Sequence, residues 1–164
     1  MRSFDVLLGS PASVEQVHAA FTSEEYWRAR HAIFDAGTTL DSLIVDADGT
    51  VTMQATQHVG RQLLPRVMAG LISGDLQILH NETWRPVGDR RVQGRVSVTA
   101  PLVSGRATAL LEPVANGSQL TFTANVEVRI PLVGGKFEGN IGADLTNNIT
   151  EIQRFTTTWI TEHA

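Results

Sequence analysis

The chain has 164 residues, of which 42% are hydrophobic and 18% charged, which is enough for the core of one domain over residues 1–164 and too little for two. Its formal charge of −4 and its lack of any run of Lys or Arg argue against a nucleic-acid-binding surface and against a patch for anionic membranes, because both need clustered positive charge. There is no cysteine, no signal-peptide pattern and no apolar stretch approaching ~18 residues, so we expect a cytoplasmic protein without disulfides or an integral membrane segment.

The N-terminal part predicts a strand followed by two short helices. Residues 3–9 are a short mixed run that ends in a glycine–serine–proline turn, which is typical of a strand and its exit. Ser13 followed three residues later by Gln16 matches a capping box, so a helix should begin just after Ser13. Ser23 is a second N-cap signal, and the helical pattern behind it runs to about Phe34.

From about residue 40 the hydrophobic period changes to two, which is typical of half-buried strands. One face of these strands is apolar and the other polar, most regularly in the last one. Residues 60–74 interrupt the alternation with an apolar segment edged by glycines, which we interpret either as a lid at a cavity mouth or as a plug that closes the core. About six antiparallel strands are expected, separated by turn residues, over residues 40–45, 51–55, 75–85, 91–100, 103–114 and 118–130.

Residues 137–160 predict one long amphipathic helix, because at about 100° per residue their apolar side chains share an arc of roughly 120°. Asn148 lies inside this stripe, and Glu138 and Thr156 lie near its edge. The segment is rich in Thr and Asn, which are poor helix formers, so the helix must pack on a large apolar surface. A curved antiparallel sheet with one apolar face is that surface, which predicts an α+β fold with space between sheet and helix. The stripe consists of Phe137, Ile141, Leu145, Ile149, Ile152, Phe155 and Trp159.

This order of elements, together with Asn81–Glu82–Thr83–Trp84 and the turn at residues 130–135, resembles the START-like, Bet v 1-like (SRPBCC) superfamily with the helix-grip fold. More narrowly, the chain is similar to an actinobacterial branch of that superfamily that has no assigned function. The resemblance implies a curved sheet of about seven strands wrapped around the C-terminal helix. It also implies an internal cavity, used across the superfamily for lipids, sterols, polyketides and other apolar small molecules. Some relatives are polyketide cyclases and others are carriers, and no motif here matches a catalytic set of the cyclases.

Signatures of several common chemistries are missing from the sequence. Gly134–Gly135–Lys136 lacks the first glycine of a phosphate-binding loop, and the G-x-S-x-G motif of hydrolases is absent. The five histidines are scattered singly, without the spacing of metal ligands, so we expect no metal site and no cofactor.

Alternation along the middle of the chain places His80 and Glu82 on the same face as Leu76, Ile78 and Trp84. A desolvated carboxylate beside an imidazole is suited to act as an acid/base pair or to orient a polar group of a ligand, so His80 and Glu82 are the catalytic candidates. The alternative is that the two residues satisfy each other, or neighbouring backbone groups, at the rim of the sheet.

The remaining ligand-binding candidates are apolar residues of the inner face, the two methionines Met53 and Met68, and Asn148 of the long helix. Trp84 and Trp159 either line or fill the cavity. Tyr26 and Trp27 lie on the second short helix, where they either gate the entrance or pack in the core. The full predicted set is Met53, Met68, Ile78, His80, Glu82, Trp84, Val96, Phe122, Ile141, Leu145, Asn148 and Ile152.

Three functions stay open on this basis. The first is binding or carriage of a hydrophobic small molecule, such as a lipid, a fatty acid or a polyketide-like compound. The second is an enzyme of the polyketide cyclase or dehydratase type that uses His80 and Glu82. The third is a ligand-free protein-interaction module. The chain is expected to be a monomer or a homodimer, with the strand over residues 118–130 as an exposed edge or as a dimer seam.

Overall fold

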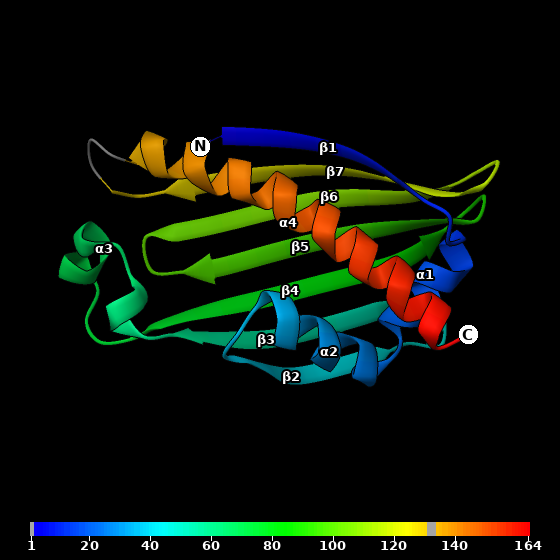
Figure 1. Cartoon of the computed structure of the whole chain (residues 1–164), viewed down its shortest axis with the longest axis horizontal. Coiled ribbons are helices and arrows are strands. Elements are labelled where there is room, and N and C mark those ends of the chain that lie inside the picture. The colour runs from blue at the N-terminus through cyan, green and yellow to red at the C-terminus, as the bar shows by residue number, and fades with distance from the viewer. Residues whose placement is uncertain (1, 131–133) are drawn as a thin grey trace.

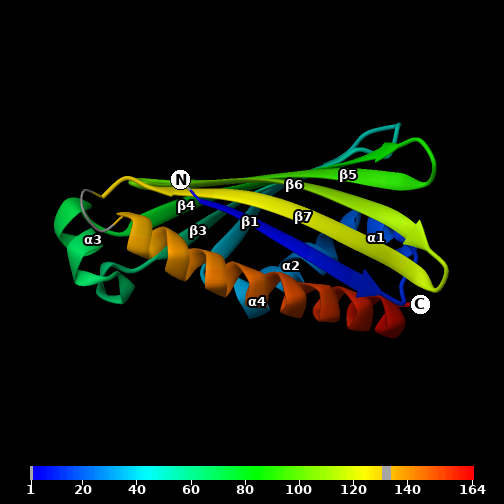
Figure 2. The same ribbon diagram turned by 90° about the horizontal axis from the view of Figure 1, so that it is seen from above.

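The computed structural model describes residues 2–130 and 134–164, and it contains a seven-stranded antiparallel sheet with helices on one of its faces (Figures 1 and 2). The strand order is β1-β7-β6-β5-β4-β3-β2. This architecture confirms the predicted α+β helix-grip fold. The elements are β1 (Arg2–Ser10), α1 (Val14–Phe21), α2 (Glu24–Phe34), β2 (Thr38–Val45), β3 (Val51–Val59), the 3-10 turn η1 (Arg61–Leu63), α3 (Arg66–Leu71), β4 (Leu76–Val87), β5 (Arg91–Ala100), β6 (Val103–Val114), β7 (Gly117–Val128) and α4 (Gly134–Glu162).

The two short helices begin where their capping residues predict. The side chain of Ser13 accepts a hydrogen bond from the backbone N–H of Gln16, whose side chain accepts one from the backbone N–H of Ser13, so the capping box is complete. Ser23 caps α2 by accepting from the backbone N–H of Tyr26 at 3.3 Å.

The pairing of the last strand corrects one prediction. β7 lies between β6 and β1, with Arg2 opposite Val126 at one end of the β1–β7 ladder and Ser10 opposite Ser118 at the other. The strand is therefore neither an exposed edge nor available as a dimer seam, and β1 and β2 form the edges of this sheet. Periodicity could not show this, because it reports which face of a strand is buried and not which strands are neighbours.

Helix α4 crosses the inner face of the sheet diagonally and is held near its two ends (Figure 1). In its first half, Gly142 meets the ring of Phe4 on β1, where an added Cβ would overlap the ring. Close by, the buried carboxylate of Glu138 accepts a hydrogen bond from the backbone N–H of Val128 at 2.9 Å. In its last half, α4 packs on Tyr26 of α2 through aromatic side chains.

Between these two contact regions the predicted apolar stripe faces the sheet, but its side chains are only partly buried. Ile141, Leu145 and Ile152 are only half-buried, whereas Ile149 is buried. These four side chains of α4 line the two pockets described in the next subsection.

Residues 60–74 contain η1 and α3 and close the opposite end of the fold from α1. Met68 and Ile72 are buried in a second apolar cluster with Leu76 and Ile130, among others. Neither of the two inner pockets described below takes a lining residue from this segment. Of the two interpretations of the segment, its packing corresponds to the plug.

Candidate functional site

The space under α4 consists of two adjoining pockets of about 200 Å³ and about 150 Å³. They share four lining residues, Val96, Val98, Phe122 and Leu145, and together they are called the inner site below. The walls of the larger pocket come from α1, from α2, from the inner face of the sheet and from α4. The apolar residues that line it are Val17, Phe21, Trp84, Val96, Val98, Leu111, Leu120, Phe122, Leu145, Ile149 and Ile152.

The sheet leaves this room because its central strands carry glycine and alanine at inward positions. The register places Val96 beside Ala107 and Ala107 beside Ala124, and one step further along the strands Val98 lies beside Gly105. Gly105, Ala107 and Ala124 line the smaller pocket, and larger side chains at these positions would fill it.

A glycine also shapes the closed end of the site. Gly94 lies opposite Trp84 on the neighbouring strand, and a Cβ at this position would overlap the indole ring. The indole of Trp84 therefore lies across β5 and packs on Phe21 of α1, with ring centroids 4.7 Å apart.

The polar end of the inner site lies beside Trp84 and centres on Glu82. The carboxylate Oε2 pairs with Arg30 Nη2 at 3.1 Å, and Oε1 accepts a hydrogen bond from Trp84 Nε1 at 3.0 Å. The guanidinium of Arg30 also lies over the ring of Trp27, 4.8 Å from its centroid. Both oxygens of Glu82 are thus engaged, which leaves this carboxylate poorly placed to act as a general base.

His80 lines the same pocket but does not contact Glu82. Its Nε2 lies 3.2 Å from Gln57 Oε1 on β3, and no hydrogen bond joins it to Glu82 among the described residues. Burial lowers the pKa of His80 below its usual value, and the charge of Arg30 acts in the same direction, while Asp35 and Glu82 partly oppose the change. Burial likewise lowers the pKa of His31, which lies next to Arg30. Both imidazoles are therefore neutral at pH 7.

Two buried donors at this site have no partner in the described part of the chain. They are Arg30 Nε and the amide nitrogen of Gln153, and both side chains line the larger pocket. Thr156, by contrast, is satisfied, because its hydroxyl bonds to Tyr26 Oη at 2.6 Å and donates to the carbonyl of Ile152.

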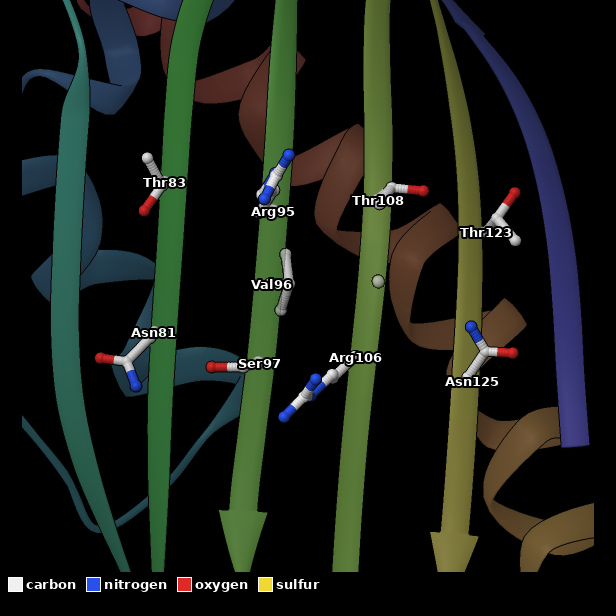
Figure 3. Close-up of a pocket in the computed structure, with 10 residues that line it drawn as sticks. Asn81, Thr83, Arg95, Val96, Ser97, Arg106, Thr108, Thr123 and Asn125 are labelled. Atoms are coloured by element: carbon white, nitrogen blue, oxygen red, sulfur yellow. The ribbon is translucent and has the colours of Figure 1, made fainter. Parts of the chain in front are cut away.

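A different concavity, of about 330 Å³, lies on the outer face of the sheet (Figure 3). Two rows of polar side chains cross it, and neither of its arginines, Arg95 and Arg106, has an ion-pair partner among the residues that the structure describes. Nothing in this groove is both polar and buried without a partner, so solvent satisfies it. The rows are Thr83, Arg95, Thr108 and Thr123, and Asn81, Ser97, Arg106 and Asn125.

The inner site brings together most of the residues predicted to bind a ligand. His80, Glu82, Trp84, Val96, Phe122, Ile141, Leu145, Asn148 and Ile152 all line one or both pockets. Asn148 is exposed, which places it at the mouth and not among buried groups.

Three of the predicted ligand-binding residues line neither pocket, and the two aromatic residues of α2 pack in the core. Met53 is fully buried in the main core cluster and Met68 in the plug, while Ile78 packs against the second cluster. The inward faces of Met53 and Ile78 were predicted, but neither side chain lines a pocket. Tyr26 and Trp27 are 0% exposed, so they anchor the core and do not gate an entrance.

Three polar residues that line the larger pocket were not among the predicted ligand-binding residues: Arg30, Asp35 and Gln153. A signal for Arg30 was present, because it follows Tyr26 by four residues and Trp27 by three, and therefore lies on the buried face of α2. Asp35 and Gln153 carried no such signal.

Two further features bear on other kinds of site. Within residues 2–130 and 134–164, no three His, Asp or Glu side chains gather as a metal site would require. In the same residues, no helix has the length and hydropathy needed to span a bilayer.

Known proteins share both this sequence and this fold. A profile of the family described as "Protein of unknown function (DUF2505)" matches residues 6–160. The uncharacterized protein Rv0481c of Mycobacterium tuberculosis is 39% identical over 173 residues, with 99% of each chain covered. The uncharacterized protein Mb0491c of Mycobacterium bovis has the same identity and coverage.

Solved structures extend the likeness in fold. TTHA0849 of Thermus thermophilus has a TM-score of 0.60 at 13% identity, with 99% of each chain covered. Ara h 8.0201 has a TM-score of 0.56 at 12% identity, with 98% of each chain covered. A START superfamily protein of Mycobacterium smegmatis has a TM-score of 0.54 at 9% identity, with 99% of each chain covered. The chain therefore belongs to the DUF2505 family of proteins of unknown function, and it has the helix-grip fold of the START and Bet v 1-like proteins.

Proposed function

We propose that this protein binds a hydrophobic small molecule in the inner site between the sheet and α4. The observation that carries the proposal is the pair of adjoining, mostly apolar pockets under the helix, which have a small set of buried polar groups at one end. Ligand sites commonly have this construction, with apolar walls for the body of the ligand and a few polar groups that orient one end. The two pockets together reach the lower end of the roughly 300–1,000 Å³ that such sites usually offer.

Binding or carriage is favoured over acid/base catalysis by the state of Glu82. Both of its oxygens are already engaged by Arg30 and Trp84, so the predicted pair of His80 and Glu82 does not operate as a unit. A cyclase or dehydratase activity would rest on His80 alone, whose neutral imidazole lines the pocket. The ligand-free interaction module is disfavoured because it calls for a filled interior.

A matched pair of variants on β5 tests the proposal. Val98 lines both pockets, so Val98→Phe should fill the space that they share. Thr99 is the next residue and lies exposed on the opposite face, so Thr99→Phe adds the same ring outside the site. The uncharged probe N-phenyl-1-naphthylamine gains fluorescence in apolar surroundings and reports occupancy.

The wild type and Thr99→Phe should bind the probe with equal affinity, while Val98→Phe should lose about tenfold or more. Native mass spectrometry of protein purified from its own host should in addition reveal an apolar compound at a stoichiometry near one. Equal binding by all three proteins, with Val98→Phe folded by circular dichroism, would place the probe outside the inner site and refute the proposal. Absence of binding to the wild type would refute it as well.

A further inference from the structure

The polar end of the inner site contains hydrogen-bond donors that lack acceptors, and this points to the chemistry of the ligand. We propose that the ligand presents an uncharged oxygen acceptor, such as the carbonyl of a ketone, ester or amide, to Arg30 Nε and the Gln153 amide. This inference rests on the proposed function, because it names the class of molecule that the same site would hold.

Arg30 is the first of the two donors. Its guanidinium carries five N–H groups, and Nη2 is used by Glu82. The side chain is only 12% exposed, and its Nε is buried without a hydrogen-bond partner among the described residues. Buried donors in native proteins are nearly always paired, so an unpaired one beside a pocket indicates a group that completes it.

Gln153 is the second donor and comes from a different element. Its amide nitrogen is buried without a partner in the described chain, and its side chain lines the pocket from α4 while Arg30 lines it from α2. Two unpaired donors from two helices face one space, so a single acceptor oxygen between them could satisfy both.

Tyr26 Oη interacts with the guanidinium of Arg30, but Nε itself has no hydrogen-bond partner among the described residues. The other neighbouring polar groups do not supply the acceptor either. The carboxylate of Glu82 is taken up by Arg30 and Trp84, and the hydroxyl of Thr156 by Tyr26 and its own helix. His80 bonds to Gln57. Asp35 lines the pocket but is half-buried, and water can solvate it.

The charges around the site argue against an anionic head group. The positive charge of Arg30 is balanced by Glu82, and Asp35 adds a negative charge on the pocket wall. His31 and His80 contribute no compensating positive charge, because both are neutral. A buried carboxylate or phosphate would thus lie near two carboxylates with one guanidinium already engaged, which is unfavourable in a poorly solvated site.

Three ten-carbon compounds that differ only in the head group test this inference: decane, 2-decanone and decanoate. Each is titrated against N-phenyl-1-naphthylamine at about pH 8, where decanoate is ionised and histidine is neutral. We expect 2-decanone to displace the probe at a concentration about tenfold lower than either of the others.

Two variants assign the preference to the named donors. Arg30→Lys keeps a positive charge opposite Glu82 but removes Nε, and Gln153→Met removes the amide at similar volume. Each should bring the affinity for 2-decanone to within about threefold of that for decane, with both compounds measured on the same variant. Arg28→Lys is the matched control, because Arg28 lies on the same helix, is 59% exposed and should leave all three affinities unchanged.

The outcomes separate this inference from the proposed function. If none of the three compounds displaces the probe, the site does not bind apolar molecules and both proposals fail. If all three bind equally, water satisfies the two donors and only the inference is overturned. Tightest binding by decanoate would overturn it too, and so would a ketone preference that survives in folded Gln153→Met.

Discussion

Replacing Arg30 by methionine removes the guanidinium that pairs with Glu82 at the polar end of the inner site. The two side chains are 12% and 10% exposed and their charged atoms lie 3.1 Å apart, so the variant leaves a carboxylate buried without a counter-charge. Removing one partner of a buried ion pair costs about 3–5 kcal/mol in free energy of unfolding. At roughly 2–4 °C per kcal/mol for a chain of this size, the Tm should fall by about 6–20 °C.

Urea unfolding followed by circular dichroism measures this loss, and two more variants isolate the pair. Glu82→Gln keeps an acceptor for Trp84 Nε1 but leaves Arg30 without a counter-charge. The double variant removes both charges, so it should be more stable than Arg30→Met alone, with a coupling energy of about 1–3 kcal/mol. Arg28→Met, at an exposed position of the same helix, should change the stability by less than about 1 kcal/mol.

Two results would contradict this account of the polar end. One is a loss below about 1 kcal/mol for Arg30→Met, because a buried unpaired carboxylate cannot cost so little without water reaching it. The other is strict additivity in the double variant, which would mean that the two charges do not interact.

Two further predictions concern the helix anchor and the buried histidines. Gly142→Leu should lower the free energy of unfolding by about 1–3 kcal/mol in urea, because the new side chain collides with Phe4 on β1, and an unchanged stability would show that the helix does not approach β1 so closely. Burial lowers the pKa of His31 and His80 from 6.5. At acid pH the unfolded chain therefore binds more protons than the folded one. The stability that comes from keeping the two imidazoles neutral is fully present above about pH 6.5 and is lost as the pH falls toward the folded pKa values. The Tm should therefore drop between about pH 7.5 and 5.5, and less so in the variant with both histidines replaced by glutamine; equal slopes in the two proteins would refute this origin.

The order of the elements and the starts of the two short helices could be predicted from the sequence because they depend on neighbours along the chain. The Ser13 capping box and the Ser23 cap involve residues three apart, and both helices begin where these caps indicate. Alternation likewise placed Glu82 and Trp84 on the inner face of β4, since successive side chains of a strand point to opposite faces.

The neighbours of each strand could not be predicted in the same way. Pairing of β1 with β7 closes more than a hundred residues of chain, and no local pattern encodes it. This pairing places the last strand, which the sequence left as a possible edge, in the interior of the sheet. Equally, the small residues Gly105, Ala107 and Ala124 carry no signal of a site in the sequence, and only their adjacency on the neighbouring strands β6 and β7 makes them part of a pocket wall.

The sequence by itself determined the type, order and buried faces of the elements, and with them the fold class. Tertiary structure decided which inward residues surround a space and which fill the core, so Phe122 and Leu145 line the pocket whereas Met53 and Met68 do not. It also decided that Arg30 and Gln153, from helices distant in sequence, face the same pocket with buried donors unpaired. The physical reason is that periodicity and caps arise from short-range geometry, while a binding site arises where long-range packing stops short of filling the interior.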